Sequence, residues 1–168
     1  MPAAPSEADL EAAAARLGDL LLARGWQFAC AESSTAGMIA ASVTTVPGSS
    51  RYFRGGVVAY ANEAKTDLLG VPEEMIANYG AVSVEVAAAM AHGVRERLGA
   101  DLAVAVTGIA GPDGGSTAKP VGLHYLGASR SGTGPTVERQ VFAHDRAGNR
   151  RSATLAALNL AISLAEAP

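Results

Sequence analysis

The chain has little of what marks secreted, metal-binding or nucleic-acid-binding proteins. Its single cysteine, Cys30, excludes a disulfide within the chain, and its apolar surroundings predict a buried, unreactive thiol. Histidine, cysteine and carboxylate side chains nowhere have the spacing of metal ligands, so we expect no metal. The net charge of −3 argues against a nucleic-acid partner, since binding a phosphate backbone usually requires a basic face.

Long hydrophobic runs are also missing. No apolar run approaches the about 20 residues that cross a bilayer, and the first residues carry Glu7, Asp9 and Glu11 without the basic start of a signal peptide. We therefore expect a cytoplasmic protein without membrane contact. Hydrophobic residues make up 49% and charged residues 17%, which is typical of a folded chain. The 168 residues suffice for a single domain.

Helix-like and strand-like segments alternate along most of the chain. Apolar residues recur at helical spacing between Ser6 and Gly25, and strand-like runs follow at residues 26–31 and 55–60. The continuous apolar run at residues 102–106 is typical of a strand covered on both faces. Two further strand-like runs, residues 121–129 and 136–143, flank a glycine-containing turn and predict a hairpin. Together these segments predict an α/β fold, a single-domain three-layer α/β/α sandwich on a mixed β-sheet.

Polar residues predict where several helices begin. Ser34 or Thr35 could cap a helix that carries Met38, and Asn62 is expected to cap a short helix. Ser83 precedes a longer amphipathic helix. The last helix is expected to start after Asp145.

Two glycine-containing turns follow predicted strands, at residues 31–37 (AESSTAG) and 107–115 (TGIAGPDGG). Loops at the carboxyl ends of strands are where open α/β sheets bind ligands. A sharp strand-to-helix turn would expose the hydroxyl of Ser33 beside free N–H groups that could hold an oxyanion. The alternative is that these hydroxyls only cap a helix. The turn lacks the Gly-x-Ser-x-Gly pattern, so an α/β-hydrolase is not indicated.

A nucleophilic serine needs a base. His92 and His124 lie within a predicted helix and strand, where structural roles are commoner, and nothing marks His144 as a triad member. Lys65 lies in the first turn of a helix, where the helix dipole and desolvation would both lower its pKa. A neutral amine of this kind suits a Ser–Lys pair, although a solvated surface lysine is the alternative. The Ser-x-x-Lys match at residues 116–119 lies between glycines and a proline, so we interpret it as a chance match.

Three arginines crowd the start of the last helix. Arg146, Arg150 and Arg151 would suit a phosphate there, or they form a solvated basic face. The loop at residues 108–115 is neither a dinucleotide fingerprint nor a P-loop, but its glycines would let the backbone approach a flat ligand.

The chain resembles the CinA carboxy-terminal domain family, the stand-alone nicotinamide-nucleotide amidases. The resemblance covers nearly the whole chain, about residues 8–165, and departs from the family's usual Glu-Ser-Cys-Thr-Gly-Gly at Ser34 and Ala36. The added Cβ of Ala36 bears on whether the turn there needs a glycine. The matching segments are 31–37 (AESSTAG), 48–50 (GSS), 60–65 (YANEAK), 80–83 (GAVS), 108–115 (GIAGPDGG), 119–122 (KPVG) and 145–146 (DR).

The resemblance implies hydrolysis of the carboxamide of nicotinamide mononucleotide to nicotinic acid mononucleotide and ammonia, in pyridine nucleotide recycling. It assigns the nucleophile to Ser33, the base to Lys65, a supporting role to Tyr60 and substrate phosphate binding to Arg146. It also implies self-association, a small-molecule nucleotide substrate and no cofactor. The alternative is a non-catalytic nucleotide-binding module associated with competence. The expected substrate-binding residues are Ser34, Thr35, Gly37, Asn62, Gly108, Ile109, Ala110, Gly111 and Arg146.

Overall fold

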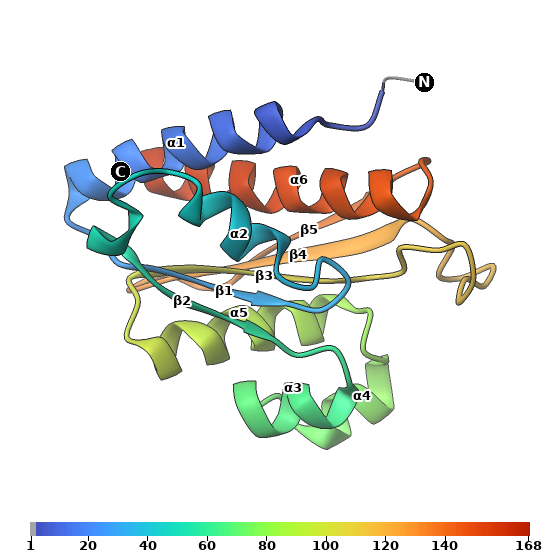
Figure 1. Ribbon diagram of the computed structural model, residues 1–168. Coiled ribbons are helices and arrows are strands. Elements are labelled where there is room, and N and C mark those ends of the chain that lie inside the picture. Colours follow the sequence, from blue (N-terminus) through green and yellow to red (C-terminus); the bar gives the residue numbers. More distant parts are fainter. Residues whose placement is uncertain (1–2) are drawn as a thin grey trace.

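Three layers make up the molecule, as the sequence predicts. The computed structural model describes residues 3–168. Helices α1 (Glu7–Arg24), α2 (Met38–Thr44) and α6 (Arg146–Glu166) cover one face of a central sheet (Figure 1). Helices α3 (Asn62–Leu69), α4 (Glu73–Tyr79) and α5 (Val84–Leu98) lie on the opposite face. No helix of residues 3–168 is long and apolar enough to cross a membrane.

The sheet is mixed and has the strand order β2-β1-β3-β4-β5. The strands β1 (Phe28–Glu32), β2 (Phe53–Val58) and β3 (Leu102–Gly108) are parallel, whereas β4 (Leu123–Arg130) and β5 (Thr136–Val141) add an antiparallel hairpin. A short 3₁₀ turn, Ser49–Arg51, leads into β2. The carboxyl ends of β1 and β3 therefore lie side by side, which is where ligands bind in sheets of this kind.

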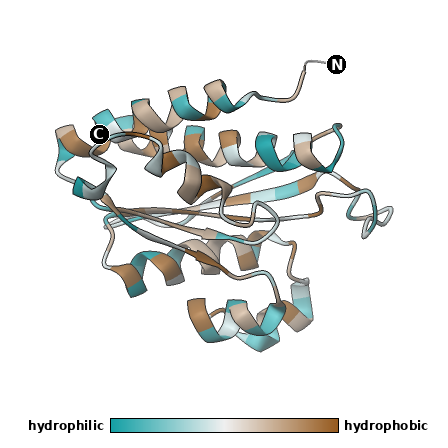
Figure 2. Ribbon diagram, in the orientation of Figure 1, coloured by the Kyte–Doolittle hydropathy of each residue, from teal (hydrophilic) through white to brown (hydrophobic). Residues whose placement is uncertain are grey.

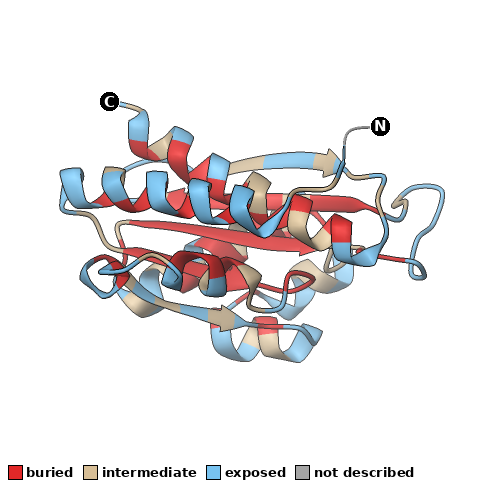
Figure 3. Ribbon diagram, turned by 45° about the horizontal axis from the view of Figure 1, so that its top comes forward, coloured by how far each residue is buried: buried red, intermediate tan, exposed pale blue. Residues whose placement is uncertain are grey.

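Each face of the sheet carries its own hydrophobic core. The residues of β3 alternate, so that Val104 and Val106 pack towards α1 and α6, while Ala103 and Ala105 pack towards α5. The helices correspondingly alternate between brown and teal residues along their lengths in Figure 2. Figure 3 shows the central strands buried and the outer sides of the helices exposed. The uninterrupted apolar run of β3 thus follows from burial on both faces, as the sequence predicts.

Most of the expected helix ends are confirmed, and two are wrong. Ser6 and Gly25 cap α1, Ser83 caps α5, and Asp145 caps α6 through Gly148. Asn62, however, is the first residue of α3, and the capping position falls on Ala61 without a side-chain bond. Neither Ser34 nor Thr35 caps α2, because the chain makes a further turn before that helix and Gly37 takes the capping position.

A close contact between helices fixes the position of α3, the helix that carries Lys65. Gly93 of α5 lies against the end of α3, where a Cβ at residue 93 would be only 1.9 Å from the carbonyl oxygen of Leu69. A side chain at this position would push the two helices apart. The absence of a side chain at Gly93 therefore keeps α3 against α5, and Leu69 and Met90 share the core between them.

Candidate active site

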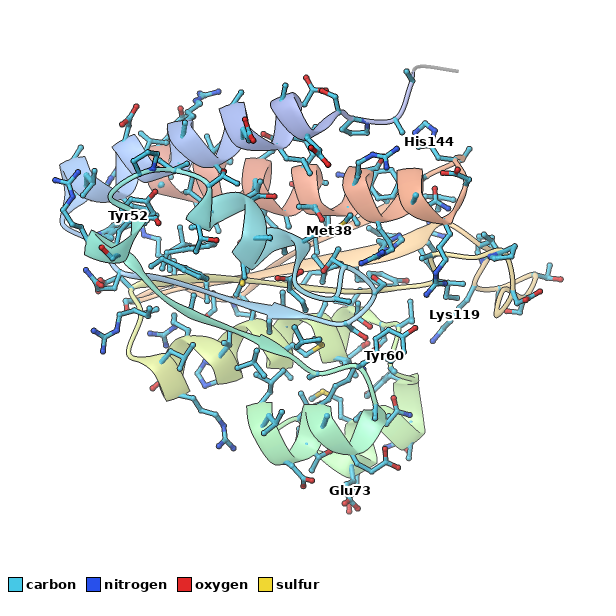
Figure 4. All side chains as sticks on the ribbon, in the orientation of Figure 1. Met38, Tyr52, Tyr60, Glu73, Lys119 and His144 are labelled. Atoms are coloured by element: carbon cyan, nitrogen blue, oxygen red, sulfur yellow. The ribbon has the colours of Figure 1, made fainter. Side chains whose placement is uncertain are left out.

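A pocket of about 290 Å³ lies at the carboxyl ends of β1 and β3. Its wall combines the turn after β1, the segment from Tyr60 into α3, the loop after β3 and the start of α6. Tyr60 and Lys119 mark this end of the molecule in Figure 4. Of the twelve residues expected at the site, ten line the pocket: Ser33, Ser34, Tyr60, Asn62, Lys65, Gly108, Ile109, Ala110, Gly111 and Arg146.

The other two expected residues, Thr35 and Gly37, do not line the pocket. Thr35 is fully buried within the turn. The amide of Gly37 donates to the carboxylate of Glu32 at 3.0 Å, and the same carboxylate accepts from the amides of Ile39 at 3.1 Å and Ala40 at 3.0 Å. A buried side chain thus takes up the N–H groups at the start of α2. The amides of Gly37, Ile39 and Ala40 are therefore not free to hold an oxyanion.

Ser33 lies at the bend between β1 and this turn. Its amide donates to the carbonyl of Val106 at 3.0 Å, and its carbonyl accepts from the amide of Ala36 at 3.1 Å. These two bonds join the backbone of Ser33 to β3 on one side and close the turn on the other. The residue is 8% exposed and lines the pocket, so the fold holds Ser33 at the pocket wall.

Lys65 is almost completely buried, with 1% of its surface exposed. Its Nζ donates to the carbonyl oxygens of Ala59 and Tyr60, each at 3.0 Å. Burial lowers the pKa of this amine, and the nearby carboxylate of Glu63 partly offsets the effect. The sequence predicted the direction of this shift, but burial rather than the helix terminus is its main cause. The surface-lysine alternative is wrong.

Tyr60 reaches the site in two ways. Its carbonyl holds Lys65, while its hydroxyl accepts from Nη2 of Arg146 at 3.3 Å. A second donor of Arg146, Nη1, bonds the carbonyl of Gly111 at 2.7 Å. The tyrosine therefore orients the lysine through the backbone, and its ring links β2 to the start of α6 across the pocket. No carboxylate of residues 3–168 forms an ion pair with Arg146, so its charge is available to an anion.

The glycine at the end of β3 makes room for a histidine. A Cβ on Gly108 would be 2.1 Å from Cδ2 of His124, whose ring is fully buried beside it. Nδ1 of His124 lies 2.9 Å from the carbonyl of Gly122, and burial lowers the pKa of the ring. His124 therefore packs against the backbone of Gly108, a residue of the pocket wall. None of the three histidines lines the pocket.

The three arginines at the start of α6 make separate contacts. Arg151 donates to the carbonyl of Pro5 at 2.8 Å, and Arg150 donates to the carbonyls of Ser34 and Thr35, each at 3.0 Å. Backbone carbonyls thus balance the two cations that would be unfavourable near a helix N-terminus. Arg146 alone lines the pocket.

The segment 116–119 with the Ser-x-x-Lys match is not helical, so its serine and lysine do not share a helix face. The hydroxyl of Ser116 accepts from the amide of Lys119, and Nζ of Lys119 bonds the carbonyl of Tyr79 at 2.8 Å. The two side chains therefore do not form a catalytic pair. Among residues 3–168, no group of histidine, cysteine and carboxylate side chains could hold a metal ion.

Five residues that line the pocket were not among the site residues expected from the sequence. Thr107 lines the pocket, and its hydroxyl donates to the carbonyl of Ala81 at 2.7 Å, which joins β3 to the segment before α5. The GAVS segment was visible as part of the resemblance and could have pointed to this wall. The remaining pocket residues that sequence reasoning missed are Ala81, Val82, Asp113 and Gly114.

Ala36 has a backbone conformation that favours glycine, with φ at +47°. A left-handed residue with a Cβ costs about 1–2 kcal/mol. Replacing this exposed alanine, Ala36→Gly, should therefore raise the free energy of unfolding by about 1 kcal/mol. For a chain of this size we expect the Tm to rise by about 2–4 °C, which thermal unfolding followed by circular dichroism would measure.

The matched control is Ala41→Gly, at an exposed position inside α2. A glycine in a helix interior should lower the free energy of unfolding by about 1 kcal/mol. If both variants lose stability alike, the strain assigned to Ala36 is refuted.

Comparison with known proteins links this pocket to one family. The family model described as the CinA C-terminal domain matches residues 10–165. A putative competence-damage inducible protein of Desulforudis audaxviator is 62% identical over 110 residues, which cover 66% of this chain and 27% of that protein. A protein of the same description from Symbiobacterium thermophilum is 53% identical over 150 residues, covering 84% of this chain and 35% of that protein. The chain thus spans about a third of the length of these curated relatives.

Solved structures show the same fold over almost the whole chain. The competence/damage inducible protein CihA of Agrobacterium tumefaciens has a TM-score of 0.91 at 39% identity, covering 98% of this chain and 99% of that one. A competence-damaged protein (CinA) superfamily protein of Escherichia coli has a TM-score of 0.88 at 30% identity, covering 96% and 92%. On these matches and on the motifs gathered around its pocket, the chain belongs to the CinA C-terminal domain family.

Proposed function

We propose that this protein is an amidase that hydrolyses the carboxamide of nicotinamide mononucleotide to nicotinic acid mononucleotide and ammonia, with Ser33 as nucleophile and Lys65 as base. One observation carries the proposal. The buried amine of Lys65 is held between two carbonyls, in the same pocket as the hydroxyl of Ser33. The substrate itself is taken from the family resemblance.

The partners of Lys65 suit a neutral amine. An uncharged amine has two N–H groups and one lone pair, and the carbonyls of Ala59 and Tyr60 accept both N–H groups. The lone pair then remains for the proton of Ser33. Burial lowers the pKa of Lys65, which favours this neutral form relative to an exposed lysine.

The proposed reaction has two steps. The Ser33 hydroxyl passes its proton to Nζ of Lys65 while Oγ bonds the amide carbon, and the C–N bond then breaks as the nitrogen takes a proton from the lysine and leaves as ammonia. Water gives its proton to Lys65 and attacks the acyl carbon, which releases the acid and restores Ser33. The residues of the chain supply every proton transfer in this scheme.

The activity is tested by incubating the protein with nicotinamide mononucleotide and measuring ammonia and the product by mass spectrometry. We expect stoichiometric ammonia and nicotinic acid mononucleotide. A measurable Kd for the mononucleotide without ammonia release would instead support a non-catalytic nucleotide-binding module.

The position of Arg146 predicts how the substrate lies. The arginine lines the pocket with Lys65 and bonds the hydroxyl of Tyr60, and its charge lacks a carboxylate partner among the described residues. Arg146→Ala should raise the KM for the mononucleotide by about 10–100-fold, since hydrogen bonds to charged groups contribute about 1.5–3 kcal/mol. Steady-state kinetics on the mononucleotide and on the unphosphorylated nucleoside would measure the change.

Arg139→Ala provides the control. Arg139 is an exposed residue of β5, so its substitution removes the same charge at a site outside the pocket. Its KM should stay near that of the parent protein. If the parent protein handles the nucleoside as well as the mononucleotide, the phosphate role of Arg146 is wrong.

A further inference from the structure

The turn that carries Ser33 is held by two oppositely charged side chains. On one side, the carboxylate of Glu32 accepts the amides of Gly37, Ile39 and Ala40. On the other side, Arg150 reaches from α6 and donates through Nε to the carbonyl of Ser34 and through Nη2 to that of Thr35, each at 3.0 Å. The anion thus binds amides at the start of α2, and the cation binds carbonyls of the turn.

Arg150 has no carboxylate partner within ion-pair distance among residues 3–168. Its fork of donors is directed at two successive carbonyls and bonds each through a different nitrogen, Nε and Nη2, which a single lysine nitrogen does not offer. Bonds from a charged donor are about twice as strong as neutral ones. Arg150 therefore fixes Ser34 and Thr35, the two residues after Ser33, to α6 near the end of the chain.

This attachment matters for the hydroxyl because it holds the residue that directly follows Ser33. The backbone of Ser33 is joined to Val106 and Ala36, and the carbonyl of Thr35 also accepts from the amide of Met38 at 3.2 Å, but no backbone amide of the described residues donates to the carbonyl of Ser34. The hydroxyls of Ser34 and Thr35 are buried without hydrogen-bond partners. Within the described residues, Arg150 is the side chain that fixes the carbonyls of these two residues.

We propose that Arg150 is a positioning residue for the amidase reaction, which holds the Ser33 hydroxyl at attacking distance by binding the carbonyls of Ser34 and Thr35. The inference rests on the proposed function. Arg150 itself does not line the pocket with Ser33 and Lys65, so it acts through the turn and not on the substrate. A misplacement of about 1 Å in a reacting group can cost about 10²-fold in rate.

The test compares Arg150→Ala and Arg150→Lys with Arg151→Ala. Arg151 is the next residue of α6, and its removal changes the charge equally while breaking only a bond to Pro5. We expect kcat to fall by about 10–100-fold in Arg150→Ala, less in Arg150→Lys, and by no more than about twofold in Arg151→Ala. KM should change little in all three. Low millimolar guanidinium should restore part of the activity of Arg150→Ala and none elsewhere.

A second readout does not depend on amide hydrolysis. An organophosphonate that labels nucleophilic serines should modify Ser33 of the parent protein, and more slowly in Arg150→Ala, with the site read by mass spectrometry. Labelling without ammonia release in the parent protein would overturn the proposed function but leave the role of Arg150 measurable. Equal labelling rates and equal kcat in Arg150→Ala and Arg151→Ala would overturn that role, as would a raised KM at unchanged kcat.

Discussion

Ser33→Ala should lower the kcat for ammonia release from nicotinamide mononucleotide by about 10⁴-fold or more, because no covalent intermediate can form without the hydroxyl. The variant should fold normally, since the side chain lies at the pocket wall and its backbone bonds remain. Binding of the mononucleotide, measured by calorimetry, should be retained. Loss of rate with retained binding would identify the hydroxyl as a reacting group.

Two serine variants make this result specific. Ser42→Ala removes a hydroxyl that bonds the carbonyl of Met38 inside α2, outside the pocket, and should leave kcat near that of the parent protein. Ser34→Ala removes the neighbouring hydroxyl of the pocket wall. If Ser34→Ala abolishes turnover while Ser33→Ala retains it, the nucleophile is Ser34 and our assignment is wrong.

Lys65→Met should lower kcat by about 10³-fold, the size expected for loss of a general base. Methionine fills most of the buried space of the lysine stem, so the variant tests the amine and not a cavity. In the parent protein, kcat should rise with pH through the lowered pKa of Lys65 and then level off, because only the neutral amine accepts a proton. A pH series of initial rates would measure both effects.

The same pKa shift predicts a stability difference of known sign. The pKa of Lys65 in the folded protein lies below its ordinary value of 10.5, so between the two values the unfolded chain binds more protons. The free energy of unfolding should therefore rise with pH across this window in the parent protein, relative to Lys65→Met. Urea titrations at several pH values would test this.

Lys119→Met is the matched control, since its amine bonds the carbonyl of Tyr79 and does not line the pocket. Its kcat and pH profile should follow the parent protein. A Lys65→Met variant that stays folded and turns over normally would exclude Lys65 as the base.

Helix-capping residues and apolar runs predicted much of the fold, because each of these signals depends only on residues close together in the sequence. The cap residues Ser6 and Gly25 and the apolar run of β3 act within a few residues of chain. The cap of α2 escaped prediction because it depends on Glu32, a strand residue that reaches the helix only after the chain has turned.

The site was predictable as a set of motifs but not as a set of contacts. The sequence motifs brought Ser33, Tyr60 and Lys65 together, and the structure places all three at one pocket. Sequence spacing could not reveal that the carbonyl of Tyr60, and not its hydroxyl, bonds the lysine. Sequence spacing also could not separate Arg150 from Arg146. Arg150 bonds the carbonyl of Ser34, more than a hundred residues earlier in the chain, whereas Arg146 bonds the carbonyl of Gly111 in the loop after β3.

The buried carboxylate of Glu32 has a consequence for how the reaction would end. Because it accepts the amides of Gly37, Ile39 and Ala40, the start of α2 is closed to the carboxylate that the proposed amide hydrolysis would create beside Ser33. That carboxylate would have to find its donors in another wall of the pocket, such as the loop after β3 or the start of α6.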